Sequence, residues 1–401
     1  MTDTGSRRHF LRSSLGASAL AVAGSALPLL GGCASAQPTS PIPAPAPGAR
    51  FAREGTFINY NEYPLGPCES AREALVEIIG QAGFYRFDLI QRFHDSLAAH
   101  LGVDAEQVIL YPGSGWALEL APRAFTSAER SLVVADPSYE ACEQVAKRMG
   151  TPVHRVPLLA NGAHDLTAMC AFPDAGLIYV CNPNNPTGTI TPREAIVSAL
   201  ANKPAGAILL VDEAYIHFSE EQSVIDLVAS HPDLIVLHTF AKLYGMAGLR
   251  CGFAVGQGEA LAKLREMGSD AISVTAAVAA QASIEDQTIV AERRAYNSGV
   301  RNDVIRWLQA RGIECTVSHT NCFMMDVGRP GKDVAAAMAS HGVHVGRSWP
   351  SWPHWVRVSV GTREDMEAFK TAFAAVQEQG PLAAAVACAP ELRLCTAAAL
   401  A

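Results

Sequence analysis

Short apolar runs recur along the chain and are separated by segments with helical periodicity. The helical segments lie at 71–82 and 89–101. The apolar runs lie at 131–135, 176–181, 207–211, 234–238 and 251–255. Brief apolar runs bounded by turn residues are typical of strands that are buried on both faces. The pattern therefore predicts an α/β fold with a mostly parallel sheet covered by helices on each side.

The last quarter of the chain has a different pattern, in which strands and helices of a second lobe are interleaved. Strands are expected at 314–317, 321–327 and 355–360, and helices are expected at 334–341 and 363–379. We expect residues 51–83 and 311–380 to form a smaller α+β domain and residues 84–310 to form the large domain. Two lobes also suit the length, because roughly 400 residues exceed one core of modest size.

Composition and charge exclude several classes of protein. With 49% hydrophobic and 17% charged residues, the chain is neither disordered nor a small disulfide scaffold. A formal net charge of −8 argues against nucleic acid as the main partner. The ten cysteines include no Cys-x-x-Cys pair, so the sequence predicts no zinc ribbon and no metal site.

Residues 1–33 have the three parts of an export signal. Arg7 and Arg8 precede an apolar, small-residue stretch at 15–30, and the Leu-Gly-Gly-Cys sequence that ends at Cys33 resembles a lipobox. The arginine pair resembles the twin-arginine type, so we expect export to the periplasm and a lipid anchor at Cys33. Cleavage after Ala36, a transmembrane anchor and a wrongly assigned start codon are the alternatives.

The segments on either side of the two domains have biased compositions. Residues 34–50 are rich in Pro and Ala, which is typical of an extended tether. The Ala-rich tail at 381–401 has no role that the sequence predicts. The nine cysteines other than Cys33 are unassigned; some could pair in an oxidising compartment, but connectivity cannot be read from sequence.

Polar residues gather where the apolar runs end, which is where ligands bind in open α/β sheets. The sequence Gly113-Ser114-Gly115-Trp116 precedes a helix and could hold an anion on free backbone N–H groups, although a plain turn has the same composition. It is neither a Rossmann fingerprint nor a P-loop. The loop at 182–188 either presents amides to the same crevice or is only a connection.

Charged side chains follow three other runs. Asp212 ends one of them, where a carboxylate needs a cation to offset its desolvation, and Tyr215 lies three residues on. Lys242 has apolar neighbours that would make it a nucleophilic amine, unless it is an ordinary lysine at a helix start. Arg250 could clamp a phosphate, and Arg357 could clamp a carboxylate, unless it is a surface arginine on an edge strand.

Together these groups meet the needs of a pyridoxal phosphate site, and their motifs match a known family. Residues 58–67, Ile-Asn-Tyr-Asn-Glu-Tyr-Pro-Leu-Gly-Pro, resemble the N-terminal signature of histidinol-phosphate aminotransferases. With the Asn-Asn-Pro-Thr-Gly, Asp-Glu-Ala-Tyr, Ala-Lys…Gly-Leu-Arg and Arg-Val-Ser-Val-Gly-Thr motifs, the chain resembles class I/II aminotransferases of fold-type I, from about residue 51 to residue 373. The resemblance implies pyridoxal 5'-phosphate as the cofactor and a large domain that binds it.

The resemblance also implies a role for each matching residue. Lys242 would bind the cofactor and shuttle the proton, Asp212 would pair with the ring nitrogen, and Tyr215 would hold the phenolic oxygen as the third catalytic residue. Arg357, Asn185 and Arg347 would bind the substrate. Among the other cofactor contacts, Asn185 would hold the phenolic oxygen and Tyr139 would stack on the ring. The phosphate would be bound by Ser114, Gly115, Thr239 and Arg250, and, in a homodimer, by Tyr85 of the neighbouring subunit.

Three features depart from the family pattern. Ala241 replaces a serine that contacts the phosphate, so we expect weaker binding of the cofactor unless Thr239 compensates. Gly115 and Trp116 replace an acidic pair, and the indole should reshape the pocket. The tryptophans at 349, 352 and 355 crowd the segment before Arg357 and suggest an unusual side-chain specificity.

The predicted reaction is transamination between an amino acid or amine and a 2-oxo acid. Export would separate the enzyme from histidinol phosphate, a cytosolic intermediate, so we expect another amino donor. Because the twin-arginine route carries folded proteins, the cofactor could be loaded before export. A decarboxylase or lyase of the same fold, and a non-catalytic exported lipoprotein that keeps the fold, are the alternatives.

Overall fold

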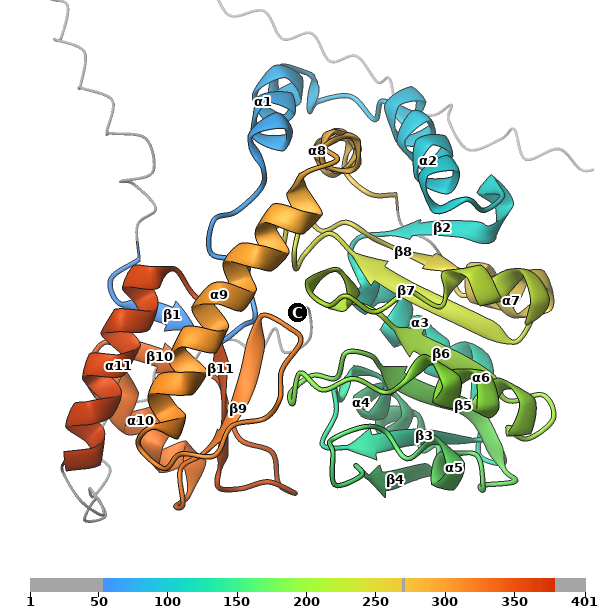
Figure 1. The fold of residues 1–401 in the computed structure, drawn as a ribbon. Coiled ribbons are helices and arrows are strands. Elements are labelled where there is room, and N and C mark those ends of the chain that lie inside the picture. The colour runs from blue at the N-terminus through green and yellow to red at the C-terminus, as the bar shows by residue number, and fades with distance from the viewer. Residues whose placement is uncertain (1–52, 269–270, 379–401) are drawn as a thin grey trace, which may run out of the picture. The chain divides into compact units, whose positions relative to one another are not determined.

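The structure is a computed structural model that describes residues 53–268 and 271–378, and its largest element is a seven-stranded sheet (Figure 1). The strand order is β2-β8-β7-β6-β5-β3-β4, and every neighbouring pair is parallel except those that β8 forms with β2 and β7. The α/β fold with a mostly parallel sheet is thereby confirmed. The strands are β2 (Val108–Tyr111), β3 (Ser131–Asp136), β4 (Val153–Pro157), β5 (Ala175–Cys181), β6 (Ile208–Asp212), β7 (Leu234–Thr239) and β8 (Gly252–Val255).

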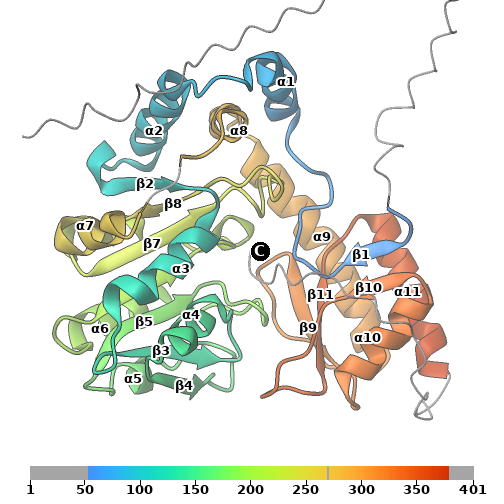
Figure 2. The same cartoon turned by 180° about the vertical axis from the view of Figure 1, so that it is seen from behind.

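Helices cover both faces of this sheet (Figures 1 and 2). Three of them pack on one face: α3 (Ser114–Phe125), α4 (Ala141–Met149) and α7 (Gly258–Glu266). The opposite face carries α2 (Phe87–Leu101), α5 (Leu166–Met169), α6 (Arg193–Asn202) and α8 (Val274–Glu285), with α1 (Glu69–Ile78) packed on α8. Because both faces are covered, the central strands are mostly apolar, as the sequence pattern predicts.

Side chains of each strand alternate between the two faces. In β6, Leu209 and Val211 belong to the core under α6 and α8, whereas Leu210 belongs to the core under α3 and α4. The alternation continues past the last apolar residue. It sends Asp212 to the α3 face, where Tyr179 contacts it, and Glu213 to the other face, beside His238.

The C-terminal part has a core of its own, with Phe323, Val356 and Phe369 fully buried at its centre. Two short sheets support it: β9 (Cys322–Asp326) pairs antiparallel with β11 (Trp355–Ser359), and β1 (Thr56–Ile58) pairs parallel with β10 (Val343–Val345). The helices are α9 (Ile289–Gln309), α10 (Gly331–Ser340) and α11 (Arg363–Glu378). Short 3-10 helices complete the fold: η2 (Ile79–Gln81), η3 (Ala105–Gln107), η4 (Ile216–Phe218) and η5 (Ile225–Ser230).

One expected strand does not form. Residues 314–317 have a single bridge, between Cys315 and Met325, because only two backbone hydrogen bonds tie this segment to β9. The short strands β1, β4 and β10 were not anticipated; β4 lies at an edge of the sheet and mixes polar with apolar residues, so it lacks the signal of a buried strand. The division into a small and a large domain stays a prediction.

The seven cysteines of the described segments are all free thiols, so the pairing left open by the sequence does not occur among them. They are Cys68, Cys142, Cys170, Cys181, Cys251, Cys315 and Cys322. Within the same segments, no helix is long and apolar enough to cross a bilayer, and no group of three or more His, Cys, Asp or Glu residues could hold a metal ion. The predicted signal with Cys33, the tether and the tail lie outside the described residues.

Candidate active site

Most of the predicted site residues come together at the carboxyl ends of the parallel strands. Asn185 follows β5, Asp212 ends β6 and Lys242 follows β7, and these three strands are neighbours in the sheet. Arg357 reaches the same place from β11, where it bonds to Asn185. Loops that leave adjacent parallel strands at one edge of a sheet form the crevice in which α/β enzymes bind their ligands.

Asp212 is the buried acid of this site. It is 3% exposed, and its carboxylate accepts hydrogen bonds from the Tyr179 hydroxyl (3.0 Å) and the Ala214 backbone N–H (3.2 Å) but forms no ion pair with any other described residue. Burial raises the pKa of Asp212 to about 6, although the Tyr179 bond and the positive charge of Lys242 act in the opposite direction. A desolvated carboxylate of this kind would be stabilised by a cation.

The Lys242 amine lies beside Tyr215. Its Nζ is 5.5 Å from the centroid of the Tyr215 ring and donates a long hydrogen bond, of 3.4 Å, to the Tyr60 carbonyl. Burial, together with the positive charge of Arg357, lowers the pKa of Lys242 to about 8. A much larger fraction of this amine is therefore neutral and nucleophilic near neutral pH than in an ordinary lysine.

A cradle of small residues lies at the amino end of α3. Gly113 precedes the helix with φ +87°, and a Cβ at this position would collide with the Arg250 guanidinium. Gly252 pairs with Thr239 between β8 and β7, and a Cβ on Gly252 would collide with the Ser114 backbone nitrogen. The two glycines thus allow Ser114, Thr239 and Arg250 to surround the first N–H groups of α3, which attract anions.

Thr239, in this cradle, and Trp116, next to Gly115, bear on two departures from the family pattern. The Thr239 hydroxyl donates to the Cys251 carbonyl (3.2 Å) and accepts the Ala241 N–H (3.1 Å), so it ties down the segment before Lys242. Trp116 follows Gly115 in the first turn of α3, and its indole N–H is buried with no partner among the described residues. Thr239 therefore holds the loop in which Ala241 stands.

Arg357 and Arg347 flank one tryptophan at the far side of the site. Arg357 donates to the Asn185 side-chain oxygen (2.9 Å) and the Asn59 carbonyl (2.6 Å), while its Nε is buried and has no partner in the described chain. Arg347 is half exposed and pairs with Glu140 at 2.5 Å. The Trp349 ring lies 5.6 Å from the Arg357 guanidinium and 4.2 Å from that of Arg347. Arg357 keeps a second N–H on each terminal nitrogen for an anion, whereas Glu140 neutralises Arg347.

The two remaining predicted tyrosines lie in different surroundings. Tyr139 is partly buried on the sheet face of Asp212; burial, with the Asp212 charge, raises the pKa of Tyr139 to about 12. Tyr85 does not join the site, because it is 81% exposed and stacks on Phe87, with 5.4 Å between ring centroids. A contact between Tyr85 and the phosphate of a neighbouring subunit stays a prediction.

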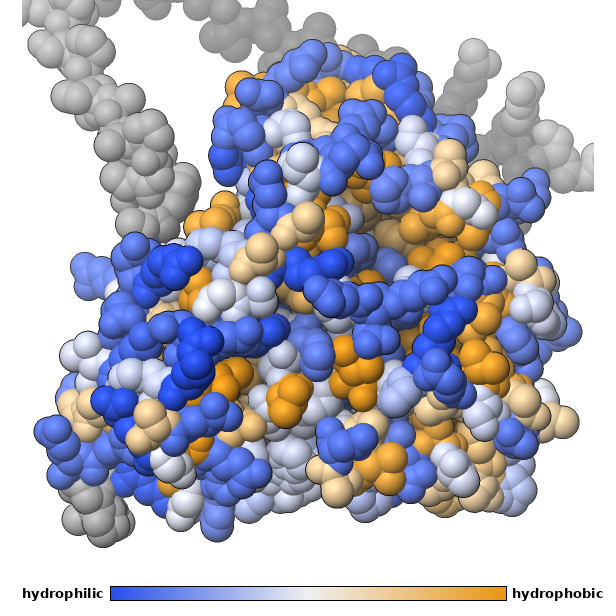
Figure 3. Space-filling view, in the orientation of Figure 1, coloured by the Kyte–Doolittle hydropathy of each residue, from blue (hydrophilic) through white to orange (hydrophobic). Residues whose placement is uncertain are grey.

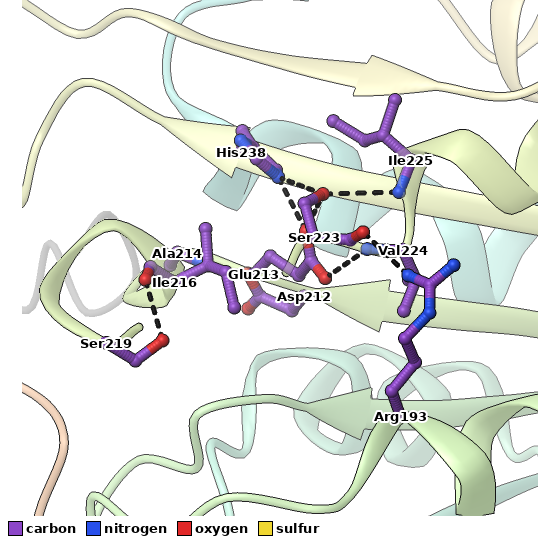
Figure 4. A network of polar contacts seen from close by, with 10 residues as sticks. All are labelled: Arg193, Asp212, Glu213, Ala214, Ile216, Ser219, Ser223, Val224, Ile225 and His238. Carbon is purple, nitrogen blue, oxygen red and sulfur yellow. Dashed lines mark hydrogen bonds and ion pairs between the residues drawn. The ribbon is translucent and has the colours of Figure 1, made fainter. Parts of the chain in front are cut away.

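Glu213 serves the opposite face from Asp212 and stabilises the strand ends. Its carboxylate lies 2.7 Å from His238 Nε2, and it accepts hydrogen bonds from the Ser223 hydroxyl (2.5 Å) and the Val224 N–H (2.9 Å) (Figure 4). Glu213 and His238 are both buried. This network ties the loop before η5 to the ends of β6 and β7, so it fixes the position from which Asp212 projects.

Reasoning from the sequence missed the parts played by Tyr179 and Asn61, and although it placed Trp349 near Arg357, it did not predict the hydrogen bond that Trp349 forms. Tyr179 was detectable, because a tyrosine two residues before the end of an otherwise aliphatic strand shares a face with the acid that ends the next strand. Trp349 donates its indole N–H to the Ser138 carbonyl at 3.1 Å, and Asn61 donates to the Tyr215 hydroxyl at 3.0 Å. These contacts join distant parts of the chain, and no local signal marks them.

Known proteins resemble this chain in sequence and in fold. Residues 56–373 match the family described as aminotransferase class I and II. A histidinol-phosphate aminotransferase of Halalkalibacterium halodurans is 30% identical over 79% of this chain and 87% of its own, and an aromatic amino acid aminotransferase of Cutibacterium acnes is 31% identical over 80% and 92%. The structure of histidinol-phosphate aminotransferase from Sinorhizobium meliloti with pyridoxal-5'-phosphate has the same fold, with a TM-score of 0.75 at 24% identity over 82% of this chain and 92% of that one.

The sheet, with a buried acid and a lysine of lowered pKa at one edge, is that of an α/β enzyme of fold-type I. The chain belongs to the aminotransferase class I and II family. The predicted fold class, activity and cofactor, pyridoxal 5'-phosphate, are thereby confirmed. The residues present fit this cofactor, because Asp212 has no ion-pair partner in the described part of the chain, Lys242 has a lowered pKa, and the glycines at 113 and 252 leave room for an anion.

The raised pKa of Asp212 predicts that Asp212→Asn stabilises the cofactor-free protein in a pH-dependent way. The folded protein binds this proton more tightly than the unfolded chain, so ionisation costs stability above about pH 6, and the cost vanishes below the ordinary value of 3.8. We expect the free energy of unfolding to rise by roughly 1–3 kcal/mol near neutral pH, and the gain to shrink towards pH 4. Urea denaturation at several pH values measures this change in the free energy of unfolding. A gain that ignores pH, or one shared by the exposed-site control Asp95→Asn, would contradict the prediction.

Proposed function

We propose that Asp212 and Lys242 hold pyridoxal phosphate between them and that the enzyme moves an amino group from an amino acid or amine to a 2-oxo acid. One observation carries this assignment: Asp212 is buried with no ion-pair partner among the described residues, and it lies near Lys242, whose pKa is about 8. A protonated ring nitrogen would supply the missing cation, and the cofactor's aldehyde requires a neutral amine. The cradle of Ser114, Gly115, Thr239 and Arg250 takes the phosphate.

The bound cofactor supplies an electron sink for the substrate carbon that loses its proton. The Lys242 amine takes this proton and returns it, while Asp212 keeps the ring nitrogen charged. Tyr139 stacks on the ring, and Asn185 and Tyr215 hold the phenolic oxygen. Arg357 binds the substrate carboxylate, because Asn185 and Asn59 fix its orientation while each terminal nitrogen keeps a second N–H to donate.

We propose an amino donor with one carboxylate and a ring in its side chain. Trp349 is buried beside two guanidinium groups, one of which is neutralised by Glu140, so the wall of the site next to Arg357 is backed by an aromatic ring and has one available cation. Such a wall favours an uncharged ring over a second acidic group. The relatives named for histidinol phosphate and for aromatic amino acids support a ring-bearing donor, and export would exclude histidinol phosphate itself.

Lys242→Ala is expected to abolish transamination, because the variant lacks the amine that we propose binds the aldehyde and moves the proton. A screen of aromatic and acidic amino donors with 2-oxo acid acceptors provides the assay, and we expect the variant to lose about 10⁴-fold or more in kcat. The visible absorbance of the bound cofactor should disappear with it. The exposed lysine variant Lys147→Ala is the control. Carbon dioxide in place of a 2-oxo acid would show a decarboxylase, and activity retained by Lys242→Ala would overturn the assignment.

We propose that the enzyme acts as a homodimer in which Tyr85 of each subunit completes the phosphate site of the other. The segment from α1 to α2 exposes large apolar side chains, and Figure 3 shows hydrophobic residues gathered near α2. Exposed apolar patches of this kind mark interaction surfaces. The exposed residues are Val76, Ile79, Phe84, Tyr85 and Phe87.

Mixing two defective variants tests this arrangement. Tyr85→Ala and Lys242→Ala should each lower activity, but a heterodimer of the two has one site that lacks both groups and one site that has both. Random assortment makes about half of the dimers mixed, so the mixture should regain about a quarter of the wild-type activity per site. A mixture no more active than the average of its parents would contradict a shared site.

We propose that residues 1–33 direct the folded enzyme to the periplasm by the twin-arginine route, with a lipid anchor at Cys33. The arginine pair, the apolar stretch and the lipobox-like sequence support this proposal. Lys replaces the charge of Arg without its planar, multi-donor group. The double substitution of Arg7 and Arg8 by Lys should therefore leave the enzyme in the cytosol, as cell fractionation would show. Cys33→Ser should still be exported but lose membrane attachment; export of the double variant would refute the route.

A further inference from the structure

Asn61 joins three parts of the chain at the edge of the site. It lies between β1 and α1, is 1% exposed, and adopts φ 55°, a left-handed conformation that Asn and Asp tolerate better than most residues. Its side chain contacts Tyr215, after β6, and Cys322, at the start of β9. Both its backbone N–H and its side-chain oxygen contact Ser359, at the end of β11.

The two bonds to Ser359 fix the orientation of the Asn61 amide. The Asn61 backbone N–H can only donate, and the Ser359 hydroxyl oxygen accepts it at 2.8 Å. The hydroxyl must therefore direct its own proton elsewhere, and Asn61 Oδ1 lies 2.8 Å away to accept it. An acceptor at this position leaves the NH₂ group of Asn61 on the opposite side, so the hydrogen-bond network allows only one of the two amide orientations.

The NH₂ group then determines the direction of the Tyr215 hydroxyl. Its two hydrogens are donated to Tyr215 Oη at 3.0 Å and to Cys322 Sγ at 3.1 Å. Because Tyr215 accepts from Asn61, its own proton is available for another acceptor. No hydrogen-bond acceptor for it is found in residues 53–268 and 271–378, and Lys242 lies over the face of the Tyr215 ring. The Tyr215 hydroxyl can therefore donate its proton in a hydrogen bond to a group that enters the site.

We propose that Asn61 and Ser359 are positioning residues that make the Tyr215 hydroxyl a hydrogen-bond donor to the phenolic oxygen of the cofactor. This inference rests on the proposed role of Tyr215. A donor at the phenolic oxygen stabilises its negative charge, so it lowers the pH at which the bound cofactor loses its proton and changes its visible absorbance. The relay from Ser359 through Asn61 to Tyr215 therefore sets that pH from a residue that never touches the cofactor.

Asn61→Asp reverses the relay with little change in shape. A carboxylate accepts only, so Tyr215 would donate to residue 61 and withdraw its proton from the cofactor. We expect the pH midpoint of the absorbance change in the purified holoenzyme to rise by about one unit, a tenfold change in proton affinity. Ser359→Ala should shift it in the same direction by less, since the amide of Asn61 would then be free to turn. The other ionisable groups facing Tyr215, which are Cys322, Arg357, Cys181 and Lys242, are unchanged in these variants.

A matched control and a double variant separate this relay from a general effect on structure. Asn297 is another buried asparagine, and its side-chain NH₂ donates to the Thr320 carbonyl oxygen at 3.1 Å. Asn297→Asp therefore introduces the same charge without touching Tyr215 and should leave the pH midpoint unchanged. Circular dichroism of each cofactor-free variant reports whether it folds. In a Tyr215→Phe background, which should itself raise the midpoint, Asn61→Asp should add nothing.

The outcomes distinguish the relay from the function on which it rests. An Asn61→Asp shift that persists unchanged in the Tyr215→Phe background, or a shift equal to that of Asn297→Asp, would overturn the relay alone. The same holds if Tyr215→Phe moves the midpoint and Asn61→Asp does not. A midpoint that Tyr215→Phe leaves unmoved would overturn the role of Tyr215, and a wild-type protein that shows no cofactor absorbance would overturn the proposed function itself.

Discussion

The desolvated carboxylate of Asp212 is the constraint on which the site depends. A negative charge at the end of a central strand is unfavourable, and the hydrogen bonds from Tyr179 and Ala214 offset only part of the cost, as the raised pKa shows. The strand can end this way because Glu213, His238 and the loop before η5 hold it in place from the other face. The acid therefore remains available for a cation, which no residue in 53–268 or 271–378 supplies as an ion-pair partner.

Positive charge in the site is distributed so that each cation has a separate task. Lys242 is kept partly neutral by burial and by the charge of Arg357, which suits it to covalent chemistry. Arg250 is held against Gly113 at the amino end of α3, where it suits a phosphate. Arg357 comes from the other core, so the site is complete only when both the large sheet and the C-terminal part have folded.

The sequence revealed those site residues that end a strand or follow one, because burial and turn chemistry leave a local pattern there. Asp212, Lys242 and the loop with Asn185 were recognisable in this way, and so was the sheet that carries them. What the sequence did not reveal depends on packing. Trp349 lies between two arginines and bonds to the Ser138 carbonyl, and Asn61 bonds to Ser359, across nearly 300 positions of the chain. The strand expected at 314–317 has a suitable composition but too few partners on β9.

The alternation of β6 has a consequence for how this enzyme can evolve. Asp212 and Glu213 are adjacent in the sequence, and each belongs to its own face of the sheet only because the strand has its present register. Loss or gain of one residue within β6 would exchange the two carboxylates: Glu213, which anchors the His238 network, would project into the site, and Asp212 would be buried beside an imidazole. Insertions and deletions should therefore accumulate in the loops on either side of β6 and be purged from the strand itself, even though neither carboxylate would be lost from the protein.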